Sequence, residues 1–124
     1  MQPVNLVNVF EDTRRLIREN PIIAEATERA VRNTIVYDDI SARPSEAIPS
    51  DAMINDIAVE VIEDTTFSAA RRLKMQFDRV GVLNFASPVN PGGGVTRGAL
   101  AQEECLCRSS NLYPCLAKFE EGVL

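Results

Sequence analysis

Residues 57–85 read IAVEVIEDTTFSAARRLKMQFDRVGVLNF, and this stretch decides the predicted fold. Apolar residues alternate with others over residues 57–61, as in a β-strand. Asp64 or Thr65 then precedes apolar residues at helical spacing over residues 67–77, which predicts a capped helix. Residues 80–85 are a nearly continuous apolar run, typical of a strand buried on both faces. Strand, helix and strand in this order predict a βαβ unit with parallel pairing, and hence an α/β fold.

Two helices are expected ahead of this unit. Asp12 is expected to cap a short helix that ends near Ile17. Asn20 and Pro21 have the residue types preferred at an N-cap and at the first helical position, so a second helix is predicted from there to Val31. The N-terminal region should therefore be mainly helical.

The predicted organisation has three segments. Residues 1–37 form a helical segment that ends in a short strand, TIVY, at residues 34–37. Residues 38–55 are rich in proline and small polar residues, which predicts a surface loop. Residues 56–124 form the main α/β part of the chain.

Composition excludes several classes of protein. The 124 residues are 45% hydrophobic and carry a net charge of −5, so one folded core is expected and direct nucleic-acid binding is not. The start, MQPVNLVNVFEDTRR, does not resemble a signal peptide. No run approaches the about 18 apolar residues that a membrane span needs. The chain is therefore expected to be cytoplasmic and to make no membrane contact.

Cysteine and histidine counts narrow the chemistry. The chain has three cysteines, Cys105, Cys107 and Cys115, and no histidine. At most three thiolates would be available for a zinc site, so no metal is expected and the thiols are predicted to be reduced and partly in the core. Without histidine, Ser-His and Cys-His nucleophile pairs are excluded within this chain.

A glycine loop follows the predicted buried strand. It contains Asn90, Pro91, Gly92, Gly93 and Gly94. Loops at the C-terminal ends of parallel strands bind ligands in open α/β sheets, and glycines let backbone N–H groups approach anionic oxygens. The loop has neither Walker nor dinucleotide spacing, so it predicts a phosphate-bearing, nucleotide-like ligand held in another way. The alternative is a flexible turn that only joins a strand to a helix.

Two adjacent carboxylates lie close behind the loop. Glu103 and Glu104 are expected near the start of a helix that begins around Ala99. Cleavage of a glycosidic bond needs a carboxylic acid to protonate the leaving oxygen and a negative group near the oxocarbenium-like carbon. The alternative is structural: Glu104 pairs with Arg108 four residues later, and Glu103 is simply solvated.

Loop and carboxylates together resemble a known family. Asn90-Pro91-Gly92-Gly93-Gly94, then seven residues, then Gln102-Glu103-Glu104 is similar to the sequence pattern of poly(ADP-ribose) glycohydrolases, in particular of the bacterial (microbial) type. The resemblance is strongest over residues 57–116 and extends more loosely to the N-terminal helices. It implies a macrodomain-like mixed sheet with flanking helices, preceded by the N-terminal helices, with residues 56–124 as the N-terminal part of the catalytic domain.

The resemblance also implies roles for single residues. Glu104 would be the general acid and later the base, and Glu103 would hydrogen-bond ribose hydroxyls. Gln102 would support the loop, residues 92–94 would line the ribose and diphosphate, and Asn90 would contact the terminal ribose. The implied reaction is hydrolysis of ribose–ribose O-glycosidic bonds with release of ADP-ribose. No cofactor and no metal are implied.

One departure from the family affects what is expected of the chain. The family places a second glycine-rich loop and an adenine-stacking aromatic further along than Leu124, so the chain resembles the N-terminal half of such an enzyme. The expected partners are poly(ADP-ribose) or ADP-ribosylated proteins, ADP-ribose, and a second copy bound through the exposed sheet edge at residues 80–85. The alternatives are a non-catalytic ADP-ribose-binding module and an inactive fragment.

Overall fold

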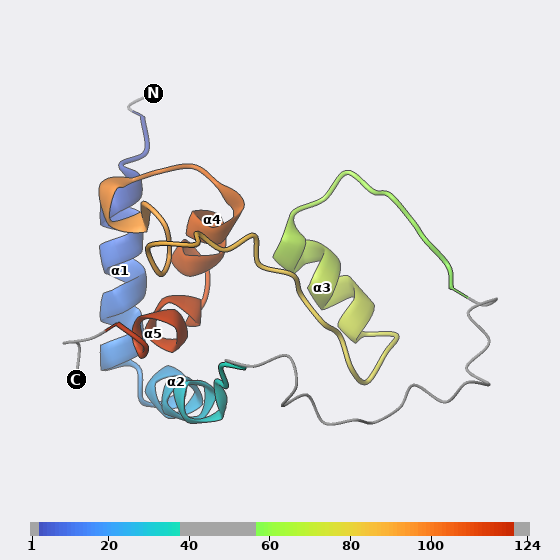
Figure 1. Cartoon of the computed structure of the whole chain (residues 1–124), viewed down its shortest axis with the longest axis horizontal. Helices are drawn as coiled ribbons and strands as arrows, with labels where there is room; N and C mark the ends of the chain where they lie inside the picture. Colours follow the sequence, from blue (N-terminus) through green and yellow to red (C-terminus); the bar gives the residue numbers. More distant parts are fainter. Residues whose placement is uncertain (1–2, 38–56, 121–124) are drawn as a thin grey trace.

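The computed structural model describes residues 3–37 and 57–120 of the chain, and the described part is helical (Figure 1). No strand and no helix long and apolar enough to cross a membrane occurs within these two ranges. The elements in chain order are α1 (Leu6–Glu19), α2 (Pro21–Asn33), α3 (Thr66–Lys74), the 3-10 helix η3 (Val95–Arg97), α4 (Gln102–Arg108) and α5 (Leu112–Ala117).

Asparagine caps define the first two helices. The Asn5 side chain accepts hydrogen bonds from the first backbone N–H groups of α1, so the predicted cap at Asp12 is wrong. Asp12 lies on the exposed surface of α1 instead, where its carboxylate accepts a 2.8 Å hydrogen bond from Arg15. Asn20 ends α1 and caps α2, and Pro21 follows at the start of α2, which confirms that prediction. Thr65 caps α3, as one of its two predicted caps.

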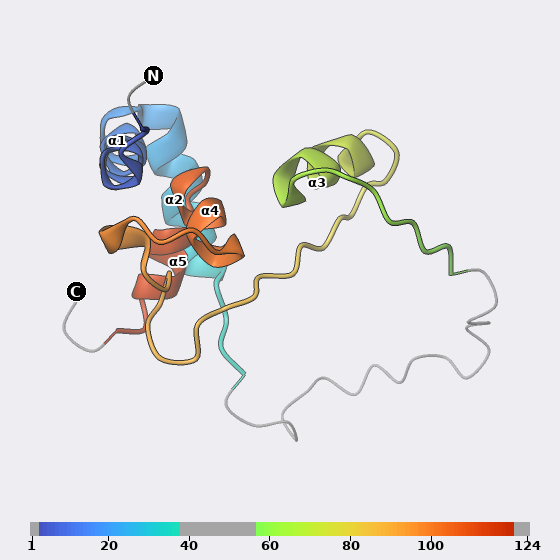
Figure 2. The same cartoon turned by 90° about the horizontal axis from the view of Figure 1, so that it is seen from above.

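A small helical bundle holds the core. Helix α1 contacts α2, α4 and η3, and α5 packs against α2 and α4. Figures 1 and 2 show these helices together in both views, with α3 separate from them. The most buried side chains are Phe10 on α1, Val95 on η3 and Cys107 on α4. The ring of Tyr113 meets Phe10 edge to face, with centroids 5.0 Å apart. The core therefore lies directly behind the glycine loop and α4.

The predicted α/β, macrodomain-like mixed sheet is wrong for the described residues. Residues 34–37, 57–61 and 80–85, each predicted as a strand, form no strand, and the latter two connect to the ends of α3 as open chain (Figure 1, green and yellow). Val59 is 86% exposed and Leu83 is 69% exposed. Because the described residues form no sheet, they offer no sheet edge for the expected self-association.

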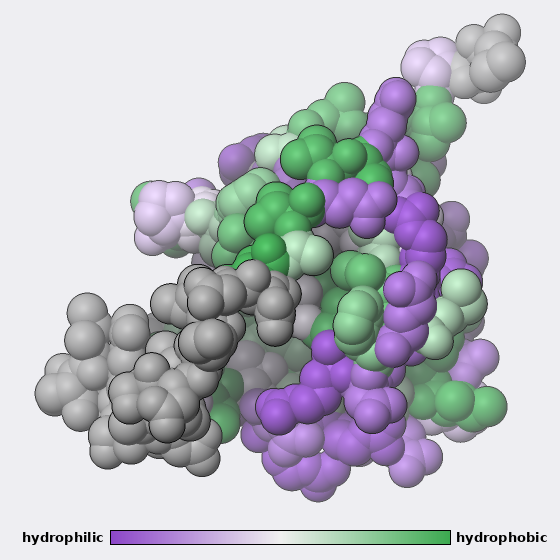
Figure 3. Space-filling model, turned by 90° about the vertical axis from the view of Figure 1, so that its right-hand side faces the viewer, coloured by the Kyte–Doolittle hydropathy of each residue, from purple (hydrophilic) through white to green (hydrophobic). Residues whose placement is uncertain are grey.

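The failure has a physical reason. Alternating or continuous apolar residues favour a β-strand because its side chains can be buried on a pleated surface. Such burial occurs only where neighbouring strands and a covering layer are present. Two short strands alone are marginally stable in water at best. The described part of the chain offers residues 57–61 and 80–85 neither further strands nor a covering helix layer. Figure 3, viewed from the α3 side, shows apolar surface in green between polar patches.

Candidate active site

The glycine loop is a tight turn that only glycine forms without strain. Gly92 and Gly93 have φ angles of +74° and +58°, in the left-handed region that disfavours residues with a Cβ. The Gly93 N–H donates to the Asn90 carbonyl at 2.8 Å, and Val95 then starts η3 and enters the core. The loop is therefore a fixed structure anchored by Val95, which argues against the alternative of a merely flexible turn.

Glu103 holds the loop together from inside. Its Oε2 accepts a 2.8 Å hydrogen bond from the Ser87 N–H. Its Oε1 accepts from the Gly92 N–H at 3.2 Å and from the Asn84 side-chain amide at 3.3 Å. The residue is only 3% exposed. With three donors on its two oxygens, Glu103 is a brace between α4 and the loop, and not the solvated residue of the structural alternative.

The two carboxylate oxygens of Glu104 differ in their hydrogen bonding. Its Oε1 accepts a 2.8 Å hydrogen bond from the Gly94 N–H. Within the described residues its Oε2 makes no hydrogen bond. The residue is 7% exposed, so its carboxylate packs against the loop and does not extend into solvent. The free oxygen is the group that can meet a substrate.

The surroundings of Glu104 favour its ionised form. The hydrogen bond from the Gly94 N–H lowers the pKa of Glu104, and burial opposes this by disfavouring the charge. The N–H of Glu104 itself, the positive charge of Arg108 and the N–H of Ala101 lower the pKa further. The carboxyl group is therefore a carboxylate at neutral pH in the free protein.

The ion pair between Glu104 and Arg108 that the structural alternative required does not form. The Arg108 guanidinium is buried and donates instead to the Ala99 carbonyl at 2.8 Å, with Cys105 Sγ 3.5 Å from its other terminal nitrogen. Arg108 thereby ties the end of α4 back to the segment that precedes it. It still acts on Glu104 through its charge, as one of the lesser causes of the lowered pKa.

Gln102 replaces a missing strand neighbour. Its Oε1 accepts from the Phe85 N–H at 2.8 Å, and its Nε2 donates to the Leu83 carbonyl at 2.8 Å. These two backbone groups flank Asn84 and are the ones that a parallel neighbour would pair with. The side-chain amide thus makes the two hydrogen bonds that one residue of a parallel strand would make here. Gln102 also links α4 to α3 through Thr66 Oγ1 at 3.5 Å.

Two residues of this network were missed in the sequence. Asn84 interrupts the apolar run of residues 80–85, and its polar side chain there was the available signal. Its Nδ2 donates to Glu103, and its Oδ1 is buried with no hydrogen-bond partner among the described residues. Ser87 could not be identified from the sequence, because it binds Glu103 through its backbone N–H. Its hydroxyl accepts hydrogen bonds from the N–H groups of residues 89 and 90. Asn90 itself is exposed at the mouth of the loop.

The three cysteines differ in burial. All three are free thiols, with Cys107 and Cys115 buried and Cys105 exposed. Burial, together with the negative charges of Glu103 and Glu104, raises the pKa of Cys107 to about 12. Cys107 is consequently a protonated core residue behind the carboxylates. Within residues 3–37 and 57–120 no group of three or more His, Cys, Asp or Glu side chains is placed to share a metal ion.

A first prediction concerns Gln102. Gln102→Ala should leave the helical bundle folded but release residues 83–85, because both backbone partners of the amide are lost. Amide hydrogen exchange at Phe85 should accelerate by about tenfold, which corresponds to one ordinary hydrogen bond. Exchange within α1 should not change. Equal exchange rates at Phe85 in both proteins would show that Gln102 does not hold this segment.

A second prediction concerns pH. Because folding lowers the pKa of Glu104, its contribution to the free energy of unfolding is complete above the ordinary value of 4.5. The contribution is lost as the pH falls below 4.5 and through the lower folded-state pKa. Denaturant unfolding of the wild type and of Glu104→Gln at neutral pH and at about pH 3 should therefore show the wild type losing more stability. Parallel losses in the two proteins would contradict this electrostatic account.

Comparison with known proteins identifies a family for the chain. The family model described as "Microbial-type PARG, catalytic domain" matches residues 11–122, which is most of the chain. No curated protein and no solved structure matches the chain. The matched range contains the glycine loop, Gln102, Glu103 and Glu104.

Proposed function

Because the chain belongs to the microbial-type poly(ADP-ribose) glycohydrolase catalytic-domain family, we propose that its site hydrolyses ribose–ribose O-glycosidic bonds of poly(ADP-ribose) and releases ADP-ribose. The observation that carries the proposal is the placement of two carboxylates of α4 against one glycine loop. One of them, Glu103, accepts three hydrogen bonds, whereas Oε2 of Glu104 accepts none within the described residues.

Glu104 is the proposed acid and base. Bound substrate brings an anionic diphosphate near the carboxylate, which raises its pKa and lets it take up the proton that the free protein disfavours. As the bond from the anomeric carbon to the leaving oxygen breaks, Glu104 gives this proton to the leaving ribose oxygen. The carboxylate then accepts a proton from the attacking water, whose hydroxyl adds to the anomeric carbon.

The loop and its brace are proposed to position the sugar. Glu103 has three of its acceptor sites filled by protein donors, so it can accept at most one further hydrogen bond from a ribose hydroxyl. The unpartnered Asn84 Oδ1 is a second acceptor for such a hydroxyl. The glycine loop lets ribose and diphosphate approach the backbone, and Asn90 lies at the exposed edge where a terminal ribose would enter.

A second candidate is an ADP-ribose-binding module that does not turn its ligand over. The lowered pKa of Glu104 favours it, because a carboxyl group that stays ionised at neutral pH has no proton to donate. The two candidates differ in whether substrate binding protonates Glu104. A binding module would protect polymer ends, and a glycohydrolase would shorten them.

A comparison of two substrates tests the linkage specificity. The purified chain is incubated with poly(ADP-ribose) and, separately, with a mono-ADP-ribosylated protein, and free ADP-ribose is quantified by chromatography. Release from the polymer but not from the mono-ADP-ribosylated protein supports ribose–ribose specificity. Release from the modified protein alone would assign the site to the protein–ribose bond and overturn the proposal.

A third prediction concerns self-association. The exposed apolar side chains of residues 57–61 favour burial against a second copy, since Val59 and Val61 are 86% and 94% exposed. Light scattering after size exclusion should report a concentration-dependent dimer or larger species. Replacing both valines by lysine should shift the protein toward monomer, whereas Val4→Lys on another exposed valine should not. A monomer at all concentrations would contradict this expectation.

A further inference from the structure

A cavity opens on the side of the bundle that the proposed reaction does not use. It has a volume of about 390 Å³ and lies between α1, α2, α4 and α5. Its floor is apolar, with Phe10, Ile17, Val31 and the ring of Tyr113 among the lining side chains. This volume falls within the range of about 300–1,000 Å³ that small-molecule sites occupy.

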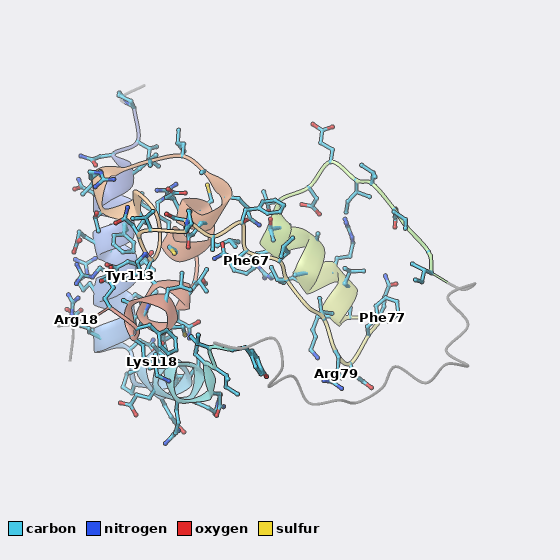
Figure 4. The ribbon with its side chains drawn as sticks, in the orientation of Figure 1. Arg18, Phe67, Phe77, Arg79, Tyr113 and Lys118 are labelled. Atoms are coloured by element: carbon cyan, nitrogen blue, oxygen red, sulfur yellow. The ribbon has the colours of Figure 1, made fainter. Side chains whose placement is uncertain are left out.

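Charge at this cavity is of one sign. Arg14, Arg18 and Lys118 line it, and no aspartate or glutamate does, although the chain as a whole has a net charge of −5. Figure 4 labels Arg18 on α1, with Tyr113 and Lys118 at the two ends of α5. Arg14 is partly neutralised by Glu11 at 3.1 Å, whereas Arg18 has no ion pair within the part of the chain that the structure describes. The rim therefore favours an anion.

The remaining polar groups of the rim are organised. The Lys118 ammonium donates to the carbonyls of Val31 and Thr34 at 2.9 and 3.2 Å, which fixes it over the C-terminal end of α2. The two carbonyls occupy two of its three donors, and the ammonium also lies 5.2 Å from the centroid of the Phe119 ring. One pre-placed ammonium and one unpaired guanidinium above an apolar floor can bind a single carboxylate that carries a hydrocarbon body.

We propose that this cavity is a second binding site, for a small organic monocarboxylate with an apolar body. The carboxylate lies between Arg18 and Lys118, and the hydrocarbon part packs on Ile17 and Val31. The site does not depend on the proposed hydrolase activity, since it contains neither Glu103 nor Glu104.

The cavity also touches the glycine loop through one side chain. Tyr113 lines the cavity and packs so closely on Gly92 that a Cβ built there would lie 2.7 Å from its Cδ2. A ligand that displaces the Tyr113 ring must move or release Gly92. Because the Gly92 N–H donates to Glu103, a ligand in the cavity should change the conformation of the glycine loop.

Nuclear magnetic resonance titration with octanoate tests the proposal. In the full chain labelled with ¹⁵N, saturable shifts are expected at the amides of Thr13 and Thr27, which line the cavity, and at Gly92. Octylammonium, with the same apolar body and the opposite charge, should not saturate at equal concentrations. Equal binding of the two amphiphiles, or octanoate shifts confined to residues 57–61 and 80–85, would overturn the proposal.

Two variants separate the cavity from general surface charge. Arg18→Gln should weaken octanoate binding by about five- to tenfold, the loss of one charge-assisted contact. Arg15→Gln is the matched control, because Arg15 lies on the same helix, outside the cavity, and pairs with Asp12. Ala117→Leu, which fills the cavity from α5, should abolish binding. Equal affinities for Arg18→Gln and Arg15→Gln would contradict the assignment even if Ala117→Leu failed to fold.

Discussion

Glu104→Gln should lower the rate of ADP-ribose release from poly(ADP-ribose) by about 10²–10⁴-fold, the usual contribution of a general acid–base group. A glutamine side chain keeps an oxygen to accept the Gly94 N–H, so the loop should retain its shape. It cannot take up and return a proton. The expected result is therefore a folded protein that still binds ADP-ribose and has lost turnover.

The measurement combines kinetics with calorimetry on the same preparations. Glu25→Gln is a suitable control, because Glu25 is exposed on α2 and far from the loop in sequence. It removes one negative charge without touching the carboxylate pair. If Glu104→Gln cleaves polymer at the rate of Glu25→Gln, the acid–base assignment is wrong. If it loses ADP-ribose binding together with turnover, Glu104 acts in binding instead.

Gly93→Ala should damage both stability and turnover. The φ angle of +58° is strained for alanine by about 1–2 kcal/mol. In addition, a Cβ at this position would collide with Glu104 Oε1 and lie 3.0 Å from Glu104 Cδ and 3.3 Å from Glu103 Oε2. Both carboxylates must shift or the loop must open. We expect a lower melting temperature and a loss of ADP-ribose release of about 10²-fold or more, since displacement by about 1 Å can have that effect.

Gly81→Ala is the matched control for this change. A Cβ at Gly81 has no atom within 4 Å, and Gly81 is not among the positive-φ glycines. Thermal unfolding and polymer hydrolysis of the two variants should differ clearly. A Gly93→Ala protein as stable and as active as Gly81→Ala would mean that the turn conformation described here is not required.

The helices could be predicted where local chemistry determines them. Asn20 and Pro21 satisfy the free backbone groups at the start of α2 by themselves, and Thr65 does so for α3. Asp12 was misleading because a capping residue type also occurs on exposed helix surfaces, where Arg15 pairs with it. The strands could not be predicted correctly, since a strand depends on partners that the residues of one segment do not specify.

The site was predictable in position but not in detail. The sequence pattern singled out the glycines and the Gln-Glu-Glu run, and in the structure Gly92 and Gly94 donate to Glu103 and Glu104. Which oxygen each N–H donor reaches depends on the tight turn at Gly92 and Gly93, and on Gln102 holding residues 83–85 against α4. The contribution of Ser87 is a backbone N–H and leaves no trace in side-chain chemistry. The predicted roles of Glu103 and Glu104 in the reaction stay predictions until turnover is measured.

The central claim is that the Glu104 carboxylate of α4, held by the glycine loop, catalyses hydrolysis of the polymer, and a single-turnover measurement tests it most directly. The chain is mixed in excess over poly(ADP-ribose) ends, and free ADP-ribose is measured over time. Under these conditions even a slow hydrolysis step can be detected. We predict time-dependent release of ADP-ribose by the wild type and none above background by Glu104→Gln. Intact polymer in the presence of wild-type chain that demonstrably binds ADP-ribose would contradict the claim and identify a binding module.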